Sequence, residues 1–356
     1  MDAIQKQLLE AVAGLHEIPV GAYNIRANGK SEGRNSTEHI EITTREEGDG
    51  IIIRIKDGTR KESVHIPVVM SQAGLEEVVY NDFYVGDDCD VTIIAGCGIH
   101  NGGDASSRHD GIHSFFIGKN SRVKYVEKHY GSGDGKGERI MNPETIIEIG
   151  ENSVMEMDTV QIKGVDSTKR MTRAKLMEGA SLKVMERLMT HGTQDAESRF
   201  IVDMDGENSG ANIISRSVAK DDSRQLFQSV LNGNAACSGH TECDAIIVGN
   251  AKISSIPEIT ANSSDAALIH EAAIGKIAGE QIYPDFKEKS DIWCSTGMRK
   301  QVKDLWDKLP KFRDNMDKVA TLHVPYKKNL IVSALEDPDF KVQTMTNAGQ
   351  YHYKLD

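Results

Sequence analysis

The chain has little cysteine and no long apolar segment. Its 356 residues include five cysteines, an odd and sparse set that in a reducing compartment indicates free thiols or metal ligands rather than a disulfide framework. No stretch approaches the roughly 18 consecutive apolar residues of a membrane-spanning helix. The first residues, "MDAIQKQLLEAVAG", also lack the basic and apolar regions of a signal peptide. We therefore expect a cytoplasmic protein without a membrane partner.

Positive charge is also scarce. The sequence has 42 Lys and Arg residues against 54 Asp and Glu residues, which gives a net charge of −12. Because proteins bind the phosphate backbone through basic patches, this balance disfavours a nucleic-acid partner.

Glycine is unevenly distributed and divides the chain. Residues 1–282 hold 30 of the 32 glycines, whereas residues 283–356 hold two and are slightly basic. Apolar residues with helical spacing occur near both ends, in "DAIQKQLLEAVAGL" and "MRKQVKDLWDKL", and both apolar faces are expected to dock on the core. We expect a helix and lead-in over residues 1–39, a core domain over residues 40–282 and a helix-rich segment over residues 283–356.

One pattern recurs through the glycine-rich part. "DFYVGDDCDVTII", "SFFIGKNSRVKYV" and "IIEIGENSVMEMD" each contain an alternating apolar run, a glycine, two small or polar residues and a second alternating run. Period-two alternation marks half-buried strands, and glycine suits a tight bend where φ is positive. The repeat glycines are Gly86, Gly118, Gly150, Gly179 and Gly249, with weaker copies at Gly206 and Gly275.

The repeat predicts a mainly β protein built as a β-solenoid. Strands that recur roughly every 25 to 32 residues suit stacked coils, because each coil buries its inner face only against its neighbours. A β-sandwich of hairpins is the alternative, but hairpins favour two-residue Asn-Gly or Asp-Gly turns instead of this glycine-first turn. We expect one continuous solenoid from about Ile40 to Ile277.

Three polar residues lie at similar offsets from the last two repeat glycines. Cys243 comes six residues before Gly249, and His270 and Glu271 come five and four residues before Gly275. On stacked coils, whose strands lie about 4.8 Å apart, these side chains would come from adjacent rungs. The offsets place Cys243 and Glu271 on one face and His270 on the other. A thiolate with a carboxylate or imidazole can ligate iron or zinc, or carry a persulfide, but a buried structural cysteine beside a surface His-Glu pair explains the spacing equally well.

A family resemblance supports a functional site. "TECDAIIVG" followed by "HEAAIGKIAGEQ" resembles the C-terminal core of the SufB/SufD family of iron-sulfur cluster assembly, and "GCGIHN" and "HDGIHSFFIGKNSRVKYVEKHYG" resemble its short SufB-like members. The resemblance implies a right-handed parallel β-helix that acts as a non-enzymatic scaffold for a labile iron-sulfur cluster. It also implies that Cys243 takes sulfur or ligates the cluster, with His270 and Glu271 as ligands or iron-positioning groups.

The resemblance also implies partners. These are a SufC-like ABC ATPase, a second copy or a SufD-like paralogue in a dimer, a sulfur-donating desulfurase and apo-acceptor proteins. Two departures from the family pattern stand out. The longer SufB proteins have a further interior cysteine that receives sulfur, whereas residues 144–217 contain none, and the family's ATPase-docking segment is not recognisable after "GEQ".

Two weaker metal sites and a rival function remain open. Cys237, His240 and Cys243 form a C-x2-H-x2-C run, but the second ligand pair of a structural zinc site is missing. Cys97, His100, His109 and His113 form a denser cluster that either binds a metal or lines a glycine-rich loop. The rival function is a β-helix lyase or hydrolase acting on carbohydrate, although the sequence shows neither paired acids of an obvious cleft nor a secretion signal.

Overall fold

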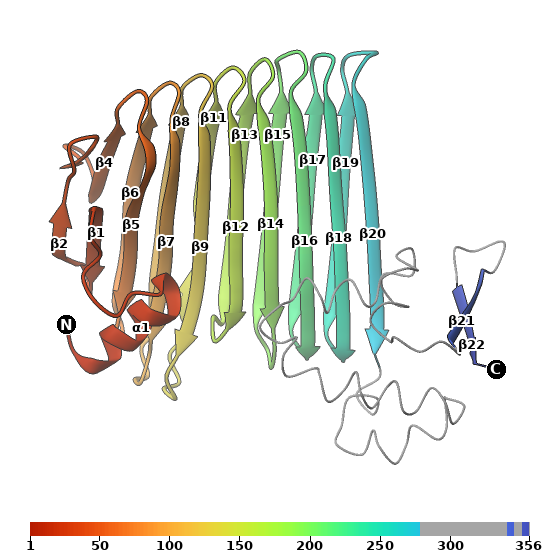
Figure 1. The fold of residues 1–356 in the computed structure, drawn as a ribbon. Helices are drawn as coiled ribbons and strands as arrows, with labels where there is room; N and C mark the ends of the chain where they lie inside the picture. Colours follow the sequence, from red (N-terminus) through yellow and green to blue (C-terminus); the bar gives the residue numbers. More distant parts are fainter. Residues whose placement is uncertain (278–339, 345–350, 356) are drawn as a thin grey trace.

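The described residues are mainly β-strand. A computed structural model describes residues 1–277, 340–344 and 351–355 (Figure 1). In these residues a single helix, α1 (Ala3–Ala13), precedes the strands. The strands are β1 (Ala22–Ala27), β2 (Lys30–Asn35), β3 (Ile40–Thr44), β4 (Gly50–Ile55), β5 (Arg60–Met70), β6 (Glu76–Val85), β7 (Asp90–His100), β8 (Ser107–Ile117), β9 (Arg122–Ser132), β10 (Arg139–Met141), β11 (Glu144–Ile149), β12 (Val154–Lys163), β13 (Ser167–Leu176), β14 (Ser181–Thr190), β15 (Asp195–Met204), β16 (Gly210–Asp221), β17 (Arg224–Gly233), β18 (Ser238–Gly249), β19 (Lys252–Ala261), β20 (Ala267–Ile277), β21 (Phe340–Thr344) and β22 (Tyr351–Leu355).

Residues 1–277 form a solenoid with two walls (Figure 1). One wall, sheet A, has the strand order β2-β1-β5-β7-β9-β12-β14-β16-β18-β20. The other, sheet B, has the order β19-β17-β15-β13-β10-β8-β6-β4-β3, with β11 beside β13 and β8. The predicted β-solenoid is confirmed. It begins earlier than Ile40, because β1 already pairs in parallel with β5.

Helix α1 covers the first coils of sheet A (Figure 1). Asp2 and Gln5 form a capping box at its N-terminus, and Gly14 ends it in the left-handed conformation. The buried residues Leu8 and Val12 lie on its inner face. The N-terminal helix was therefore predicted correctly. The helix predicted for "MRKQVKDLWDKL" lies outside the described residues.

Gly86, Gly118 and Gly150 form one corner of the solenoid, for a different reason from the predicted one, whereas Gly179 (φ 65°) and Gly249 (φ 74°) do have the predicted positive φ. Gly86, Gly118 and Gly150 stack there, and a Cβ at Gly150 would lie 2.6 Å from the carbonyl oxygen of Gly118. The positive φ angles fall two residues later, at Asn120 (54°) and Asn152 (56°). Glycine is required at these three positions because backbones of neighbouring coils approach closely, and Asn tolerates the left-handed turn.

Gly249 and Gly275 do not belong to this corner. Gly249 ends β18 and begins the turn from sheet A to sheet B, whereas the corner at Gly86 runs from sheet B to sheet A. Gly275 lies inside β20, where it pairs with Ile246. The distances along the sequence from Cys243 to Gly249 and from Glu271 to Gly275 therefore cannot be compared, because the two glycines do not occupy equivalent positions in their coils.

The interior of the solenoid is partly apolar and partly polar. Stacked columns of apolar side chains fill much of it, and the rings of Phe83 and Phe115 stack at 4.4 Å between centroids. Each such buried side chain contributes about 1.5–3 kcal/mol to folding. A smaller apolar cluster, which includes Val68, Met70 and Ile99, packs near the other corner. Buried charged and polar side chains are also present in the interior. The thiols of Cys97 and Cys243 are buried as well.

Candidate functional site

Cys243 lies inside the solenoid near its last described coil. It is on β18, its side chain is 1% exposed, and its in-register neighbours are Ser215 on β16 and Ala272 on β20. Burial raises the pKa of the Cys243 thiol to about 11, and the nearby Ser255 side chain only partly opposes this. Cys243 is therefore an interior thiol that stays protonated at neutral pH until something stabilises its thiolate.

His270 shares the inner face of the wall with Cys243. It lies on β20 in register with the fully buried Thr241, two residues from the partner position of Cys243. Its Nδ1 atom is buried and makes no hydrogen bond, and burial lowers the pKa of the imidazole. A neutral ring with an unused nitrogen is a potential metal ligand.

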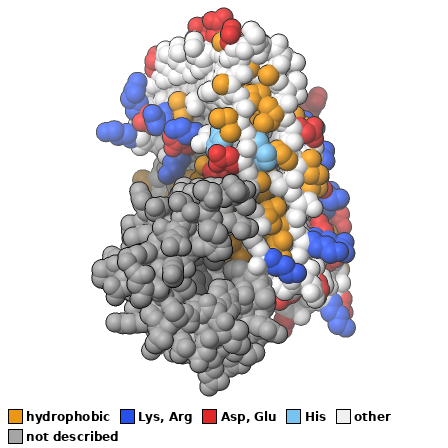
Figure 2. All heavy atoms as spheres, turned by 90° about the vertical axis from the view of Figure 1, so that its right-hand side faces the viewer, with side chains coloured by type: hydrophobic (Ala, Val, Ile, Leu, Met, Phe, Trp, Pro, Cys, Tyr) orange, Lys and Arg blue, Asp and Glu red, His pale blue; other side chains and the backbone are white. Residues whose placement is uncertain are grey.

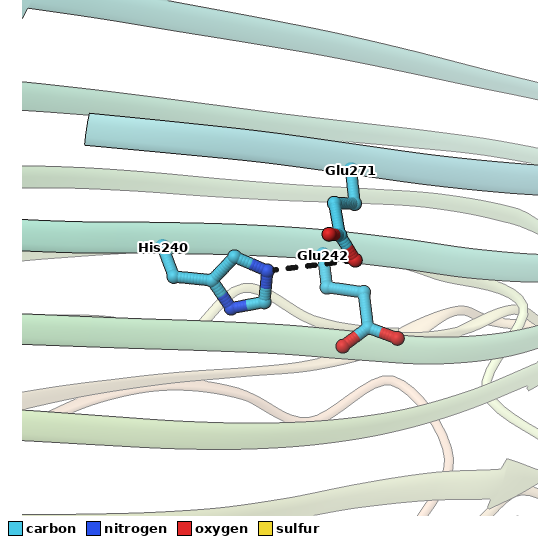
Figure 3. A group of neighbouring side chains, drawn as sticks. All are labelled: His240, Glu242 and Glu271. Carbon is cyan, nitrogen blue, oxygen red and sulfur yellow. Dashed lines mark ion pairs between the residues drawn. The ribbon is translucent and has the colours of Figure 1, made fainter. Parts of the chain in front are cut away.

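Glu271 lies on the opposite, outer face. It is in register with Glu242 on β18, and ligand atoms of His240, Glu242 and Glu271 all lie within 4.8 Å of one another (Figure 3). The prediction that Cys243 and Glu271 share a face is therefore wrong. Cys243 pairs with Ala272, and side chains alternate between faces along a strand, so a register shift of one residue exchanges the faces of His270 and Glu271.

The C-x2-H-x2-C run is divided between the two faces. Cys237 is buried in the main core, and burial raises the pKa of its thiol. His240 points outward, where its Nδ1 lies 3.0 Å from Asn212 Oδ1. The three residues of the run therefore do not come together as one zinc site.

The denser cluster is only partly assembled. Cys97 and His109 are both buried, and His109 lowers the pKa of the Cys97 thiol. His100 lies at the end of β7 and bonds Ser132, and His113 is buried against the hydroxyl of Tyr125, 3.0 Å away.

The second imidazole beside Cys97 comes from His129, which is in register with it on β9. Burial opposes ionisation of the Cys97 thiol, but the charges of His109 and His129 outweigh burial and lower its pKa to about 7. Burial likewise opposes charging of the imidazoles, yet Cys97 and Glu77 raise the pKa of His109 to about 10. Near neutral pH the Cys97 thiol is thus partly ionised, and its thiolate is stabilised by two imidazoles whose pKa values are raised.

Cys97 belongs to a row of buried charges that alternate in sign along the solenoid axis. On one side, His109 Nδ1 lies 3.0 Å from Glu77 Oε1, and Glu77 Oε2 lies 3.3 Å from Arg26 Nη2. On the other side, His129 Nε2 lies 3.5 Å from Glu127 Oε1. We call this row the interior charge row; it consists of Arg26, Glu77, His109, Cys97, His129, Glu127, Arg170 and Glu186.

The interior charge row ends beside Cys243. Arg170 Nη1 lies 2.5 Å from Glu127 Oε2, and Arg170 Nε lies 3.8 Å from Glu186 Oε1. The hydroxyl of Ser215, the in-register neighbour of Cys243, donates to Glu186 Oε2 at 2.8 Å. Arg170 holds the pKa of Glu127 well below its usual range against the effect of burial. Charged and polar side chains therefore lead from Cys97 to Ser215, the in-register neighbour of Cys243.

Sequence reasoning missed most of the interior charge row. Its signal was present in "VKYVEKHYG", where Tyr125, Glu127 and His129 have the same parity as the buried Val123. Polar residues at inward positions of a strand mark an interior polar site, because burying an unpaired charge is costly. Arg170 and Glu186 carry the same signal, since they share the parity of the buried Ala174 and Leu182 on their own strands. That they meet Glu127 and each other is decided only by the stacking of the coils.

The ion pair at Cys97 predicts a pH dependence. A lowered thiol pKa stabilises the fold fully above the ordinary value of 9.0, and this contribution is lost as the pH falls through about 7. In a variant whose other cysteines are alanine, the ultraviolet absorbance of the thiolate should therefore titrate with a midpoint near pH 7. His109→Gln should move the midpoint towards 9, and His100→Gln should not. A midpoint near 9 in the parent would contradict the thiolate assignment.

The chain is similar to a known family and to several of its members. A family model described as SUF system FeS cluster assembly, SufBD core domain, matches residues 77–283. An iron-sulfur cluster assembly SufBD family protein of Methanocaldococcus jannaschii is 27% identical over 251 residues, which is 69% of this chain and 78% of that protein. One from Pyrococcus horikoshii is 26% identical over 265 residues, 72% of this chain and 79% of that protein. One from Archaeoglobus fulgidus is 27% identical over 256 residues, 70% of this chain and 66% of that protein.

Within residues 1–277, 340–344 and 351–355, no helix is long and apolar enough to span a membrane. The family match covers more than half of the chain. It includes Cys97, Cys243 and the strands β18 and β20. This chain belongs to the SufBD family of the SUF iron-sulfur cluster assembly system.

Proposed function

We propose that this protein is a scaffold on which a labile iron-sulfur cluster is built, and that Cys243, His270 and Glu271 serve as its ligands. Membership of the SufBD family supports a role in cluster assembly. The observation that carries the proposal is that β18 and β20, at the end of sheet A among the described residues, carry a thiol and an imidazole on the inner face and a carboxylate on the outer face.

The donor chemistry of these residues fits an iron-sulfur cargo. Thiolate is a soft ligand that suits iron-sulfur clusters, and imidazole also binds iron. The buried Nδ1 of His270 has no hydrogen-bond partner, so it is free to take part in ligation. β20 is the last strand of sheet A among the described residues, so ligands from the inner and outer faces can meet at its edge.

We further propose that Cys97 is the interior cysteine that receives sulfur. The resemblance implies a further cysteine inside the solenoid, and Cys97 supplies one on an earlier coil than residues 144–217. Its thiolate would attack the terminal sulfur of a donor persulfide, forming a new S–S bond on Cys97 and releasing the donor as a thiolate. The interior charge row then leads from Cys97 to the neighbour of Cys243.

The free end of the solenoid supports assembly with a second chain. Among the described residues β19 and β20 end their sheets, and apolar side chains are visible on this end of the solenoid (Figure 2). Four of them are between 41% and 56% exposed: Ile256, Ile259, Ile269 and Ile274. Exposed apolar side chains on unpaired edges favour pairing with another protein. We propose a dimer, with a second copy or a SufD-like paralogue, joined through this end.

The remaining partners follow from the resemblance. A SufC-like ATPase would supply conformational work, a desulfurase would supply sulfur and apo-proteins would accept the cluster. The family's ATPase-docking segment falls outside the described residues, and the cytoplasmic location stays a prediction. The carbohydrate-active alternative has no support from the family match.

Anaerobic reconstitution tests this proposal. The full chain, incubated with ferrous iron, sulfide and thiol reductant, should become brown and retain iron and acid-labile sulfide after gel filtration. Light scattering of the same sample should give the mass of two chains. A colourless protein that retains neither iron nor sulfide would contradict the scaffold function, and a single-chain mass would contradict the dimer.

A further inference from the structure

The outer face of sheet A carries a group of metal-binding side chains that is separate from the interior thiol. His240, Glu242 and Glu271 each place a ligand atom within 4.8 Å of the other two (Figure 3). His240 and Glu242 lie two residues apart on β18, so they point to the same face, and Glu271 is in register with Glu242 on β20. Cys243, by contrast, is 1% exposed on the inner face.

Asn212 orients the imidazole of His240. Asn212 lies in register with His240 on β16, and its Oδ1 atom is 3.0 Å from His240 Nδ1. Because an amide oxygen only accepts hydrogen bonds, Nδ1 donates to it, which leaves Nε2 as the nitrogen that can bind a metal. Nε2 faces Glu271, 3.8 Å from its Oε2 atom. Metal-ligating histidines are held in this way by a partner on their second nitrogen.

The charges around the group favour a cation. Glu242 and Glu271 place two carboxylates beside the imidazole of His240. Arg216 Nη1 lies 2.8 Å from Glu242 Oε1 and contacts Asp244 as well, so the positive charge of Arg216 is shared with a second carboxylate. Glu242 keeps its other oxygen for a metal.

We propose that His240, Glu242 and Glu271 bind a divalent cation of borderline hardness, Fe²⁺, through one nitrogen and two carboxylate oxygens, without a thiolate ligand. The nitrogen and oxygen donors suit Fe²⁺ better than a soft ion such as Cu⁺. The identification of Fe²⁺ as the ion rests on the proposed function; the coordination itself rests on the geometry of β18 and β20. Iron would thus be held outside the wall and sulfur inside it, and the two would meet at the edge of β20.

Anaerobic titration of the full chain with Co²⁺, a spectroscopic substitute for Fe²⁺, tests the site. Bound Co²⁺ should give weak visible bands without the intense near-ultraviolet charge-transfer band of a cobalt–thiolate bond. The spectrum and affinity should be the same in Cys243→Ser. Competition with Fe²⁺ should remove the Co²⁺ bands.

Variants separate the ligands from their surroundings. His240→Ala and Glu271→Gln should each weaken Co²⁺ binding by at least about tenfold, and Asn212→Ala should weaken it by about 10- to 100-fold through loss of ring orientation. The matched control is Glu178→Gln, which removes an exposed carboxylate elsewhere on the solenoid.

The outcomes distinguish this site from the proposed function. A charge-transfer band that disappears in Cys243→Ser would overturn the proposal, as would unchanged Co²⁺ affinity in His240→Ala or no Co²⁺ binding at millimolar concentration. If cluster reconstitution fails while Co²⁺ binding still depends on His240 and Glu271, the outer site stands and the scaffold function does not. If reconstitution succeeds while Co²⁺ binding does not depend on His240 and Glu271, the scaffold function stands and the outer site does not.

Discussion

Replacing Cys243 by serine should abolish retention of an iron-sulfur cluster while the solenoid stays folded. A hydroxyl has little affinity for iron compared with a thiolate, and no other cysteine among the described residues lies on β18 or β20. Iron and acid-labile sulfide per chain, measured after anaerobic reconstitution and gel filtration, should fall to background.

The cost in stability should be moderate rather than negligible. Cys243 is 1% exposed inside the solenoid and not near the surface, so serine brings a polar group into a buried position. Its hydroxyl has Ser215 as an in-register neighbour, and we expect a loss of about 1–3 kcal/mol in the free energy of unfolding. Urea unfolding measures this loss.

Cys237→Ser is the matched control. Cys237 is also buried in the main core, but it lies six residues earlier, outside the proposed ligand set. This variant should lose a similar amount of stability and still retain the cluster. If Cys243→Ser assembles and transfers clusters at the parent rate, Cys243 does not have the proposed role.

Replacing Arg170 by methionine should destabilise the fold by about 3–5 kcal/mol, because removing one partner of a buried ion pair leaves an uncompensated charge. The Arg170 side chain lies between Glu127 and Glu186, and both carboxylates are nearly inaccessible to solvent. Methionine keeps most of the volume but neutralises neither carboxylate. The free energy of unfolding in urea measures the loss.

The neighbouring outer position supplies the control for Arg170. Arg173, on the same strand, is exposed, and Arg173→Met should change the free energy of unfolding by no more than about 0.5 kcal/mol. Adding Glu127→Gln and Glu186→Gln to Arg170→Met should recover part of the loss, since the buried negative charges are then removed. Equal, small effects of Arg170→Met and Arg173→Met would show that the interior charge row does not contribute to stability.

The fold was largely predictable because its signal is local and repeated. Period-two alternation around Gly86, Gly118 and Gly150 reports a buried face on every strand, and many copies of one unit average out errors in any single copy. The N-terminal helix was predictable for a similar reason, since its apolar face and its closing glycine, Gly14, lie within a few turns of one another.

The faces of the site residues were not predictable from the same pattern. Counting from Gly249 and Gly275 assumed that both mark one corner, whereas one begins the opposite turn and the other pairs inside β20. Because the side-chain period of a strand is two, an error of one residue in register exchanges the inner and outer faces completely.

By itself, the sequence determined the repeating strands, the β-solenoid and the presence of thiol, imidazole and carboxylate groups near the end of the repeat. The tertiary structure alone decided which of these groups meet. Strand register placed Cys243 and His270 inside the wall and His240, Glu242 and Glu271 outside it. Stacking of the coils brought Arg170 to Glu127, 43 residues away along the chain. Alternation along one strand is a short-range property of the chain, whereas register and stacking depend on the packing of every coil against its neighbours.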